Sequence, residues 1–248
     1  MQIFLKMWLV VIPVVVFLGV FFVYKIARIW ADKEWGKDQL KCDIDYVMAH
    51  AKPGDLIHFQ GSAIIRWTSP IHTFSHVGVI VRAPSGHLAI SEAYKTVIDR
   101  DVIRNDWHDG VQTVDLRRRL NTYETGRMAW RPVRGDDRTL GTRNSQILAM
   151  IRSYDVMPKY NMNIFDLGEY QTGADNDENL DAEGNKMFVC TSWVTHVYQT
   201  IGWLPENIYD GTLTLAHYGN DLPLPLTPQN LRWEKKSYIQ KDLLRVVK

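Results

Sequence analysis

A long apolar run near the amino terminus constrains this chain more than any other feature. The residues from Met7 to Tyr24, MWLVVIPVVVFLGVFFVY, carry no charge and lie between Lys6 and Lys25. A run of this length can cross the hydrocarbon core of a bilayer as a helix. A cleavable signal peptide, the alternative, would have a shorter apolar region and a small-x-small site after it, and no convincing site follows here. We therefore predict a single-pass membrane protein with an uncleaved anchor in residues 1–25, whose contact with membrane lipid is made by residues 7–24.

Basic residues are concentrated after this run. Only Lys6 and the amino terminus precede it, whereas five basic residues follow it closely: Lys25, Arg28, Lys33, Lys37 and Lys41. Lys and Arg beside a membrane span favour the cytoplasmic side. The charge pattern therefore predicts a cytoplasmic domain.

The rest of the chain divides into a connecting segment and one domain. Residues 26–50 are predicted to form a juxtamembrane helix, with five apolar positions among charges: Trp30, Trp35, Leu40, Ile44 and Val47. Residues 51–248 are predicted to form the folded domain. The chain is long enough for one good-sized domain with additional segments, or for two small domains.

The domain sequence predicts several strands and three helices, in an order that does not alternate. Strands are predicted at DLIHF (55–59), HVGVIVRA (76–83), HLAISEA (87–93), VQTVDL (111–116) and RMAWRPV (127–133). Helices are predicted at GSAIIRWTS (61–69), NSQILAMIRSYD (144–155) and CTSWVTHVYQTIG (190–202). Because strands and helices do not alternate as βαβ, we predict an α+β fold with an antiparallel sheet.

Composition and cysteine content exclude several functions. The net charge is +1 and no basic stripe with interleaved aromatics appears, so we expect no nucleic-acid partner. Two cysteines, Cys42 and Cys190, are too few for a disulfide framework or a thiolate zinc site, and we do not expect them to form a bridge. No H-x-x-x-H pair with an acid is present, and the acidic segment 175–185 lacks the glycine and glutamate of a calcium loop. We expect no metal and no cofactor.

Cys190 is the candidate nucleophile. It opens a predicted helix directly after the apolar residues MFV. A thiol there is activated by the positive end of the helix and by a neighbouring imidazole, and the first-turn amides can receive an oxyanion. The alternative is a buried, inert cysteine.

His76 is the candidate base and Glu92 its orienter. Along FSHVGVIV, His76 and Gly78 point to one face of the strand, and Gly78 leaves space there for a substrate or a helix. A three-residue Pro84-Ser85-Gly86 loop with Gly86 left-handed places Gly78 opposite Glu92, and thus Glu92 diagonal to His76. A two-residue loop would turn Glu92 to the other face.

The other histidines are weaker candidates. His72 precedes the strand, His87 lies near the hairpin tip and His58 lies within the first strand. His196 is on the wrong face of the Cys190 helix. Gly78 and Tyr160 are the candidate substrate-binding residues.

Taken together, PGDLIHFQG, FSHVGVIV, ISEA, FVCTSWV and the late TPQNL resemble the circularly permuted papain-like (NlpC/P60-type) cysteine hydrolases of the YiiX/YaeF group. Cys190 follows His76, as in that permuted branch, and the resemblance covers residues 51–235. It implies a papain-like α+β domain with a cysteine-bearing helix against the sheet. It also implies a Cys190–His76–Glu92 triad. Two features depart from the family pattern. Thr191 and Ser192 replace the Ser-Glu pair that often follows the cysteine, and the acidic segment 175–185 before Cys190 is an insertion relative to that pattern.

The resemblance implies acyl transfer through a thioester, but it leaves the substrate open. Family membership favours amide bonds of the peptide or cell-wall type, and allows a periplasmic domain. The anchor, the abundant aromatic residues and the predicted cytoplasmic side favour a lipid ester hydrolase or acyltransferase like lecithin:retinol acyltransferase. A non-catalytic, membrane-tethered binding module is the third alternative.

Overall fold

The structure is a computed structural model that describes residues 19–21, 23, 40–60, 74–124, 127–135, 137–161, 180–208, 218, 232–234 and 236–241. The chain divides into two units, Met1–Gln39 and Leu40–Lys248. Within the described ranges, no helix combines the length and apolar composition needed to cross a membrane. Nearly all of the anchor predicted for residues 7–24 lies outside those ranges, as do the helix predicted for residues 61–69 and the TPQNL segment.

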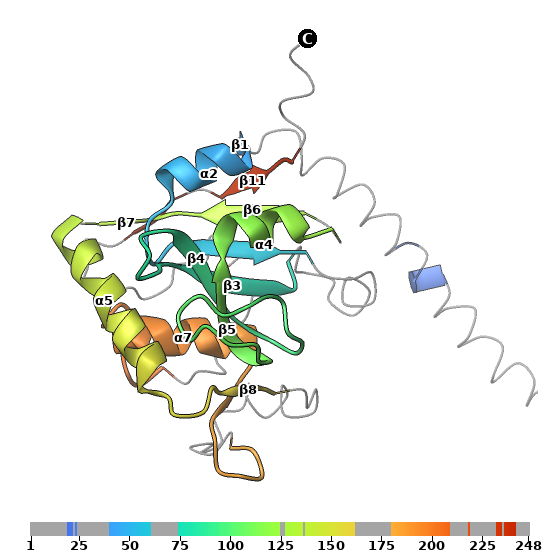
Figure 1. The fold of residues 1–248 in the computed structure, drawn as a ribbon. Helices are drawn as coiled ribbons and strands as arrows, with labels where there is room; N and C mark the ends of the chain where they lie inside the picture. Colours follow the sequence, from blue (N-terminus) through green and yellow to red (C-terminus); the bar gives the residue numbers. More distant parts are fainter. Residues whose placement is uncertain are drawn as a thin grey trace, which may run out of the picture. The chain divides into compact units, whose positions relative to one another are not determined.

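Seven of the described strands form one sheet in the second unit (Figure 1). Its spatial order is β1-β11-β6-β2-β3-β4-β5. All neighbours are antiparallel except β1 and β11, which are parallel. The strands are β1 (Leu40–Cys42), β2 (Leu56–Phe59), β3 (His76–Arg82), β4 (Leu88–Tyr94), β5 (Gly110–Asp115), β6 (Met128–Arg131) and β11 (Ser237–Ile239). The predicted α+β class with a mostly antiparallel sheet is therefore confirmed.

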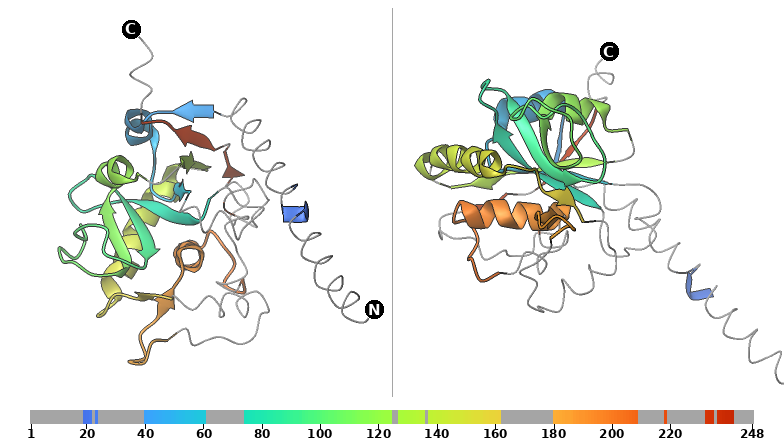
Figure 2. Two further views of the ribbon diagram at one scale, coloured as in Figure 1. Left: turned by 90° about the vertical axis from the view of Figure 1, so that its right-hand side faces the viewer. Right: turned by 60° about the horizontal axis from the view of Figure 1, so that its bottom comes forward.

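Two short ladders and four helices complete the described part of this unit. β7 (Val133–Arg134) pairs with β10 (Arg232–Trp233), and β8 (Lys159–Tyr160) pairs with β9 (Met187–Phe188). The helices are α2 (Ile44–His50), α4 (Leu116–Thr122), α5 (Asp137–Ser153) and α7 (Cys190–Thr200). In Figure 2, α5 and α7 lie toward one side of the sheet and α2 and α4 toward the other.

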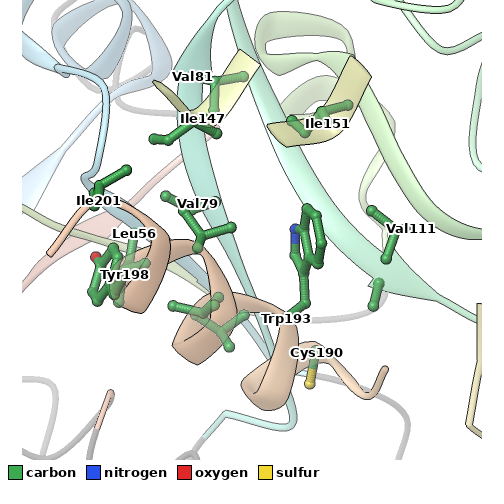
Figure 3. Packing of buried hydrophobic residues seen from close by; sticks show 14 of the residues in the cluster. Leu56, Val79, Val81, Val111, Ile147, Ile151, Cys190, Trp193, Tyr198 and Ile201 are labelled. Atoms are coloured by element: carbon green, nitrogen blue, oxygen red, sulfur yellow. The ribbon is translucent and has the colours of Figure 1, made fainter. Parts of the chain in front are cut away.

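Alternation along β3 assigns its side chains to two cores. Val77, Val79 and Val81 belong to the cluster that contains the buried residues of α5 and α7. Ile80 belongs to the second cluster, with Leu116 of α4 and other residues on that side. Figure 3 shows the first cluster between α7 and the sheet, with Cys190 at the start of the helix. Both faces of β3 are buried, because successive side chains of a strand point to opposite sides.

The β3–β4 hairpin has the predicted loop and register. Ala83 N–H donates to the His87 carbonyl at 2.9 Å, which leaves Pro84-Ser85-Gly86 as the loop. Gly86 has φ +87°, the left-handed conformation that glycine adopts without steric cost. Val79 pairs with Ser91, so the register continues to Gly78 opposite Glu92.

The bounds of three predicted elements were wrong. The strand predicted at 127–133 is divided into β6 and β7, which lie in different sheets, the helix predicted at 144–155 begins at Asp137 as α5, and Leu116, predicted in a strand, begins α4.

Two further differences concern whole elements. The helix predicted for residues 26–50 is wrong at Leu40–Cys42, which forms strand β1 against β11. The helix there is α2, which begins after Asp43, whose carboxylate accepts the Tyr46 N–H at 2.6 Å. Helix α4 was not predicted; Asp115 caps it by accepting the Arg118 N–H at 2.7 Å. In both cases a capping aspartate ends a strand and starts a helix within one residue.

Candidate active site

Cys190 is the first residue of α7, as predicted. Val189 before it is extended, with φ −91° and ψ 168°. The Ser192 hydroxyl accepts the Val189 N–H at 3.0 Å and donates to the Val189 carbonyl at 3.1 Å, which fixes the entry into the helix. The thiol is free and buried. As the first residue of α7, Cys190 belongs to the turn whose N–H groups have no intrahelical acceptor.

Trp193 anchors this end of α7 to the sheet. Its side chain is fully buried, and its indole N–H donates to the Ser91 hydroxyl on β4 at 3.0 Å. Phe188 packs edge-on against the same indole, with ring centroids 5.3 Å apart. Because β4 also carries Glu92, this anchor sets the cysteine helix against the strand that holds the candidate orienter.

His76 is the first residue of β3, and its ring is almost fully buried. Its Nε2 contacts Glu92 Oε2, so the predicted proximity of these two side chains is present. Tyr94, opposite His76 in the register, packs edge-on against the imidazole at 5.1 Å, and Phe59 lies tilted at 5.6 Å. Since Nε2 faces the carboxylate, Nδ1 is the nitrogen left for the thiol of Cys190.

Both neighbours raise the pKa of His76. Burial alone would lower it, but hydrogen bonding and charge interaction with Cys190, followed by those with Glu92, raise the pKa of His76 to about 9. Interaction with an anion favours the protonated imidazole. The imidazole therefore lies between a thiol and a carboxylate, in the arrangement that a thiol–imidazole pair requires.

Glu92 is completely buried and ionised. Burial raises its pKa, but the charges and hydrogen bonds of Arg119 and His76 outweigh this and lower the pKa of Glu92 to about 2. Gly78 makes room for it: a Cβ on Gly78 would lie 3.0 Å from the Glu92 Cβ and 2.7 Å from the Ile90 Cδ1. The space that was expected beside Gly78 for a substrate is thus filled by these two side chains.

Arg119 is the site residue that sequence reasoning missed. Its Nε donates to Glu92 Oε1 at 2.8 Å and its Nη2 donates to Glu92 Oε2 at 3.1 Å. Only 7% of the residue is exposed. A sequence signal existed, because Leu116 and Leu120 mark the buried face of α4, and Arg119 lies on that face.

Tyr160, the second candidate for substrate contact, lies near the thiol. It is half-buried on β8, and Asn161, the next residue, donates its backbone N–H to the Phe188 carbonyl at 3.1 Å. Burial, then the proximity of Cys190 and Tyr94, raises the pKa of its phenol. Its substrate role stays a prediction.

Among the described residues, the other candidate histidines are not part of this group. The ring of His196 shares a hydrogen bond with the Tyr154 hydroxyl at 2.9 Å, and His87 is exposed in the turn. His72 lies outside the described residues. His58 is fully buried, and its two ring nitrogens have no hydrogen-bond partner among the described residues; burial lowers its pKa well below the usual value. Over the described ranges, no three His, Cys, Asp or Glu side chains gather in a way that could hold a metal ion.

The four residues Cys190, His76, Glu92 and Arg119 come from α7, β3, β4 and α4. Glu92 contacts both His76 and Arg119, and Cys190 interacts with His76 from the other side. The class defined by the fold and this group of residues is an α+β protein with a candidate thiol–imidazole–carboxylate site. Comparison with protein-family models and with curated proteins finds no match for the sequence.

Proposed function

We propose that the protein is a membrane-anchored cysteine hydrolase with a permuted papain-like domain. The observation that carries this proposal is the position of the His76 imidazole, between the Cys190 thiol at a helix N-terminus and the buried Glu92 carboxylate. The chain order adds support, since the histidine strand precedes the cysteine helix. The predicted anchor in residues 7–24 supplies the membrane attachment.

The reaction we propose is acyl transfer in two steps. The Cys190 sulfur attacks the carbonyl carbon of the substrate, and the oxyanion is stabilised by N–H groups of the first turn of α7. As the carbon–nitrogen bond breaks, His76 gives its proton to the leaving amine, and a thioester remains. Water then attacks the thioester, transfers a proton to His76 and releases the acid, which restores the thiolate–imidazolium pair.

The favoured substrate is an amide of the peptide or cell-wall type. A lipid ester hydrolase or acyltransferase is the second candidate, favoured by the predicted anchor and the abundant aromatic residues. In that case the leaving group is an alcohol and the acceptor is water or a second lipid. The two candidates differ in the acyl group attached to the sulfur.

The test is the intact mass of the full-length protein after incubation with cell-wall or membrane extracts. Wild type should gain the mass of a peptidyl fragment or a fatty acyl chain, and hydroxylamine should remove it, because the bond is a thioester. Cys190→Ala should gain nothing and His76→Ala far less. Cys42→Ala is the matched control, because Cys42 is also a buried free thiol and should not affect the adduct.

Equal masses for wild type, Cys190→Ala and His76→Ala would contradict the proposal. The fold would then serve as a non-catalytic, membrane-tethered binding module. An adduct that depends on Cys190 and carries a fatty acyl chain would instead select the lipid reaction over amide hydrolysis.

A further inference from the structure

Arg119 holds the Glu92 carboxylate from the side opposite His76. The guanidinium uses Nε and Nη2 together, at 2.8 and 3.1 Å, so both oxygens of the carboxylate have a donor. Such a two-point pair fixes the plane of the carboxylate as well as its position. The oxygen that receives Nη2 is also the one that contacts His76.

Aromatic rings hold the guanidinium itself in place. The Arg119 Cζ lies 4.6 Å from the centroid of Phe59 and 5.4 Å from those of Tyr94 and Tyr123. Phe59 and Tyr94 are also the rings that contact His76. The same two aromatic side chains therefore position both partners of Glu92.

The charges at this site balance only when Arg119 is counted. With a thiolate at Cys190 and an imidazolium at His76, the buried Glu92 carboxylate would leave one uncompensated negative charge. Arg119 supplies the missing positive charge. A buried carboxylate without compensation would take up a proton or disfavour the thiolate.

We propose that Arg119 is a positioning residue of the catalytic site, which keeps Glu92 ionised and directed at His76 and thereby sets the pH range in which the thiolate–imidazolium pair exists. This inference rests on the proposed function. Removal of a buried positive charge makes protonation easier at each neighbouring group, so every pKa in the coupled site should rise. The titratable or charged groups in and around this site come from several elements. They are Cys190 of α7, His76 of β3, Glu92 and Tyr94 of β4, Arg119 of α4, Tyr123, Tyr160 of β8 and His58 of β2.

The experiment measures the rate of alkylation of Cys190 by iodoacetamide between pH 4 and pH 10, and so needs no substrate. The full-length protein with Cys42→Ala is the reference, because it has one thiol. We expect two inflections in its rate, one for formation of the thiolate and one for loss of the His76 proton. In Arg119→Met both inflections should move to higher pH, by about one unit.

Arg118→Met is the matched control. Arg118 neighbours Arg119 on the same helix but is largely exposed, and its Nε pairs with Asp99 Oδ2 at 2.7 Å. The Arg118→Met substitution removes one positive charge, as Arg119→Met does, but outside the site. Both inflections should therefore stay at the pH values of the reference. Arg119→Lys keeps the charge but lacks the planar fork. Its inflections should shift by less than half as much, while its alkylation rate falls.

The outcomes separate this inference from the proposed function. If His76→Ala leaves the reference profile unchanged, Cys190 is not paired with His76, and both proposals are overturned. If His76→Ala abolishes the second inflection but Arg119→Met leaves both in place, only the role of Arg119 is overturned. If Arg119→Met does not fold, Arg119→Lys decides: a profile equal to the reference in rate and inflections overturns the inference.

Discussion

The two faces of the sheet are covered by helices that pack on them through different kinds of interaction. On the α7 face, Val77, Val79 and Val81 pack against the apolar residues of α5 and α7, and Cys190 lies in that cluster. On the α2 and α4 face, the cluster around Ile80 surrounds a buried ion pair between Glu92 and Arg119. The first face is stabilised mainly by burial of apolar area, which has no preferred direction. The second also depends on specific partners.

This difference explains how a reactive site is assembled at the start of β3. His76 points to the same face as Gly78 and Ile80, and so its carboxylate partner comes from the α4 side. The cysteine comes from the α7 side. His76 can contact both because it is the first residue of its strand, where the sheet ends and the two faces meet. A histidine two residues further along β3 would have no such access to the thiol.

Removal of one partner of the ion pair should have the largest effect on stability. Glu92→Leu leaves the Arg119 guanidinium buried among aromatic rings without its carboxylate, and we expect a loss of about 3 to 5 kcal/mol in the free energy of unfolding. Glu92→Leu with Arg119→Leu removes both charges and should regain most of that loss. Urea unfolding of the full-length variants measures both.

The apolar face provides the comparison for this experiment. Ile147→Val, in the fully buried part of α5, removes one methylene group and should cost about 1 kcal/mol. No second substitution is expected to restore that loss. If the Glu92 and Arg119 substitutions were additive in the double variant, the α4 face would not depend on specific partners any more than the α7 face does.

The stability of the protein should fall between neutral and alkaline pH because of His76. Its pKa is 6.5 in the unfolded chain and about 9 in the folded protein. A group whose pKa is raised by folding contributes stability that is complete below pH 6.5 and is lost as the pH rises through 9. We expect a decrease on the order of 1 to 3 kcal/mol across this range, which His76→Gln should remove.

Urea unfolding at pH 6, 7.5 and 9 measures this decrease. His87→Gln is the matched control, since it removes an exposed imidazole in the β3–β4 turn and should keep the wild-type slope. Equal slopes for wild type and His76→Gln would mean that the imidazole is not held between two anions, which would contradict the prediction.

The parts of the fold that follow from local sequence were predictable. The β3–β4 register follows from Pro84-Ser85-Gly86, because a three-residue loop with a left-handed glycine has one pairing pattern. That register brings Glu92 to His76. The start of α7 at Cys190 follows from the end of the extended residues MFV, and its end follows from Gly202, which has φ +70°.

The missed features depend on contacts far along the chain or on a misleading composition. β1 pairs with β11 at the other end of the chain, and three residues are too few for a periodic signal. Arg119 is one of three consecutive arginines, a run that is typical of a solvated surface. Arg117 and Arg118 are indeed exposed, and they pair with the exposed Asp45 and the buried Asp99 respectively. Only the helical spacing to Leu116 and Leu120 distinguishes Arg119 from its neighbours.

The smallest expected effect comes from the turn that sets the register. Gly86→Ala places a side chain at φ +87°, and a Cβ there would meet no atom within 4 Å. The cost is therefore backbone strain alone, about 1 kcal/mol. Because a slip of one residue would turn Glu92 to the α7 face, the hairpin should keep its register and accept the strain. We expect a melting temperature lower by a few degrees and an unchanged pH profile of Cys190 alkylation. Ser85→Ala, beside it in the turn, should change neither. A Gly86→Ala protein with normal stability but a shifted alkylation profile would show that the hairpin had slipped, and that the turn, more than the Glu92–Arg119 pair, determines which face the carboxylate occupies.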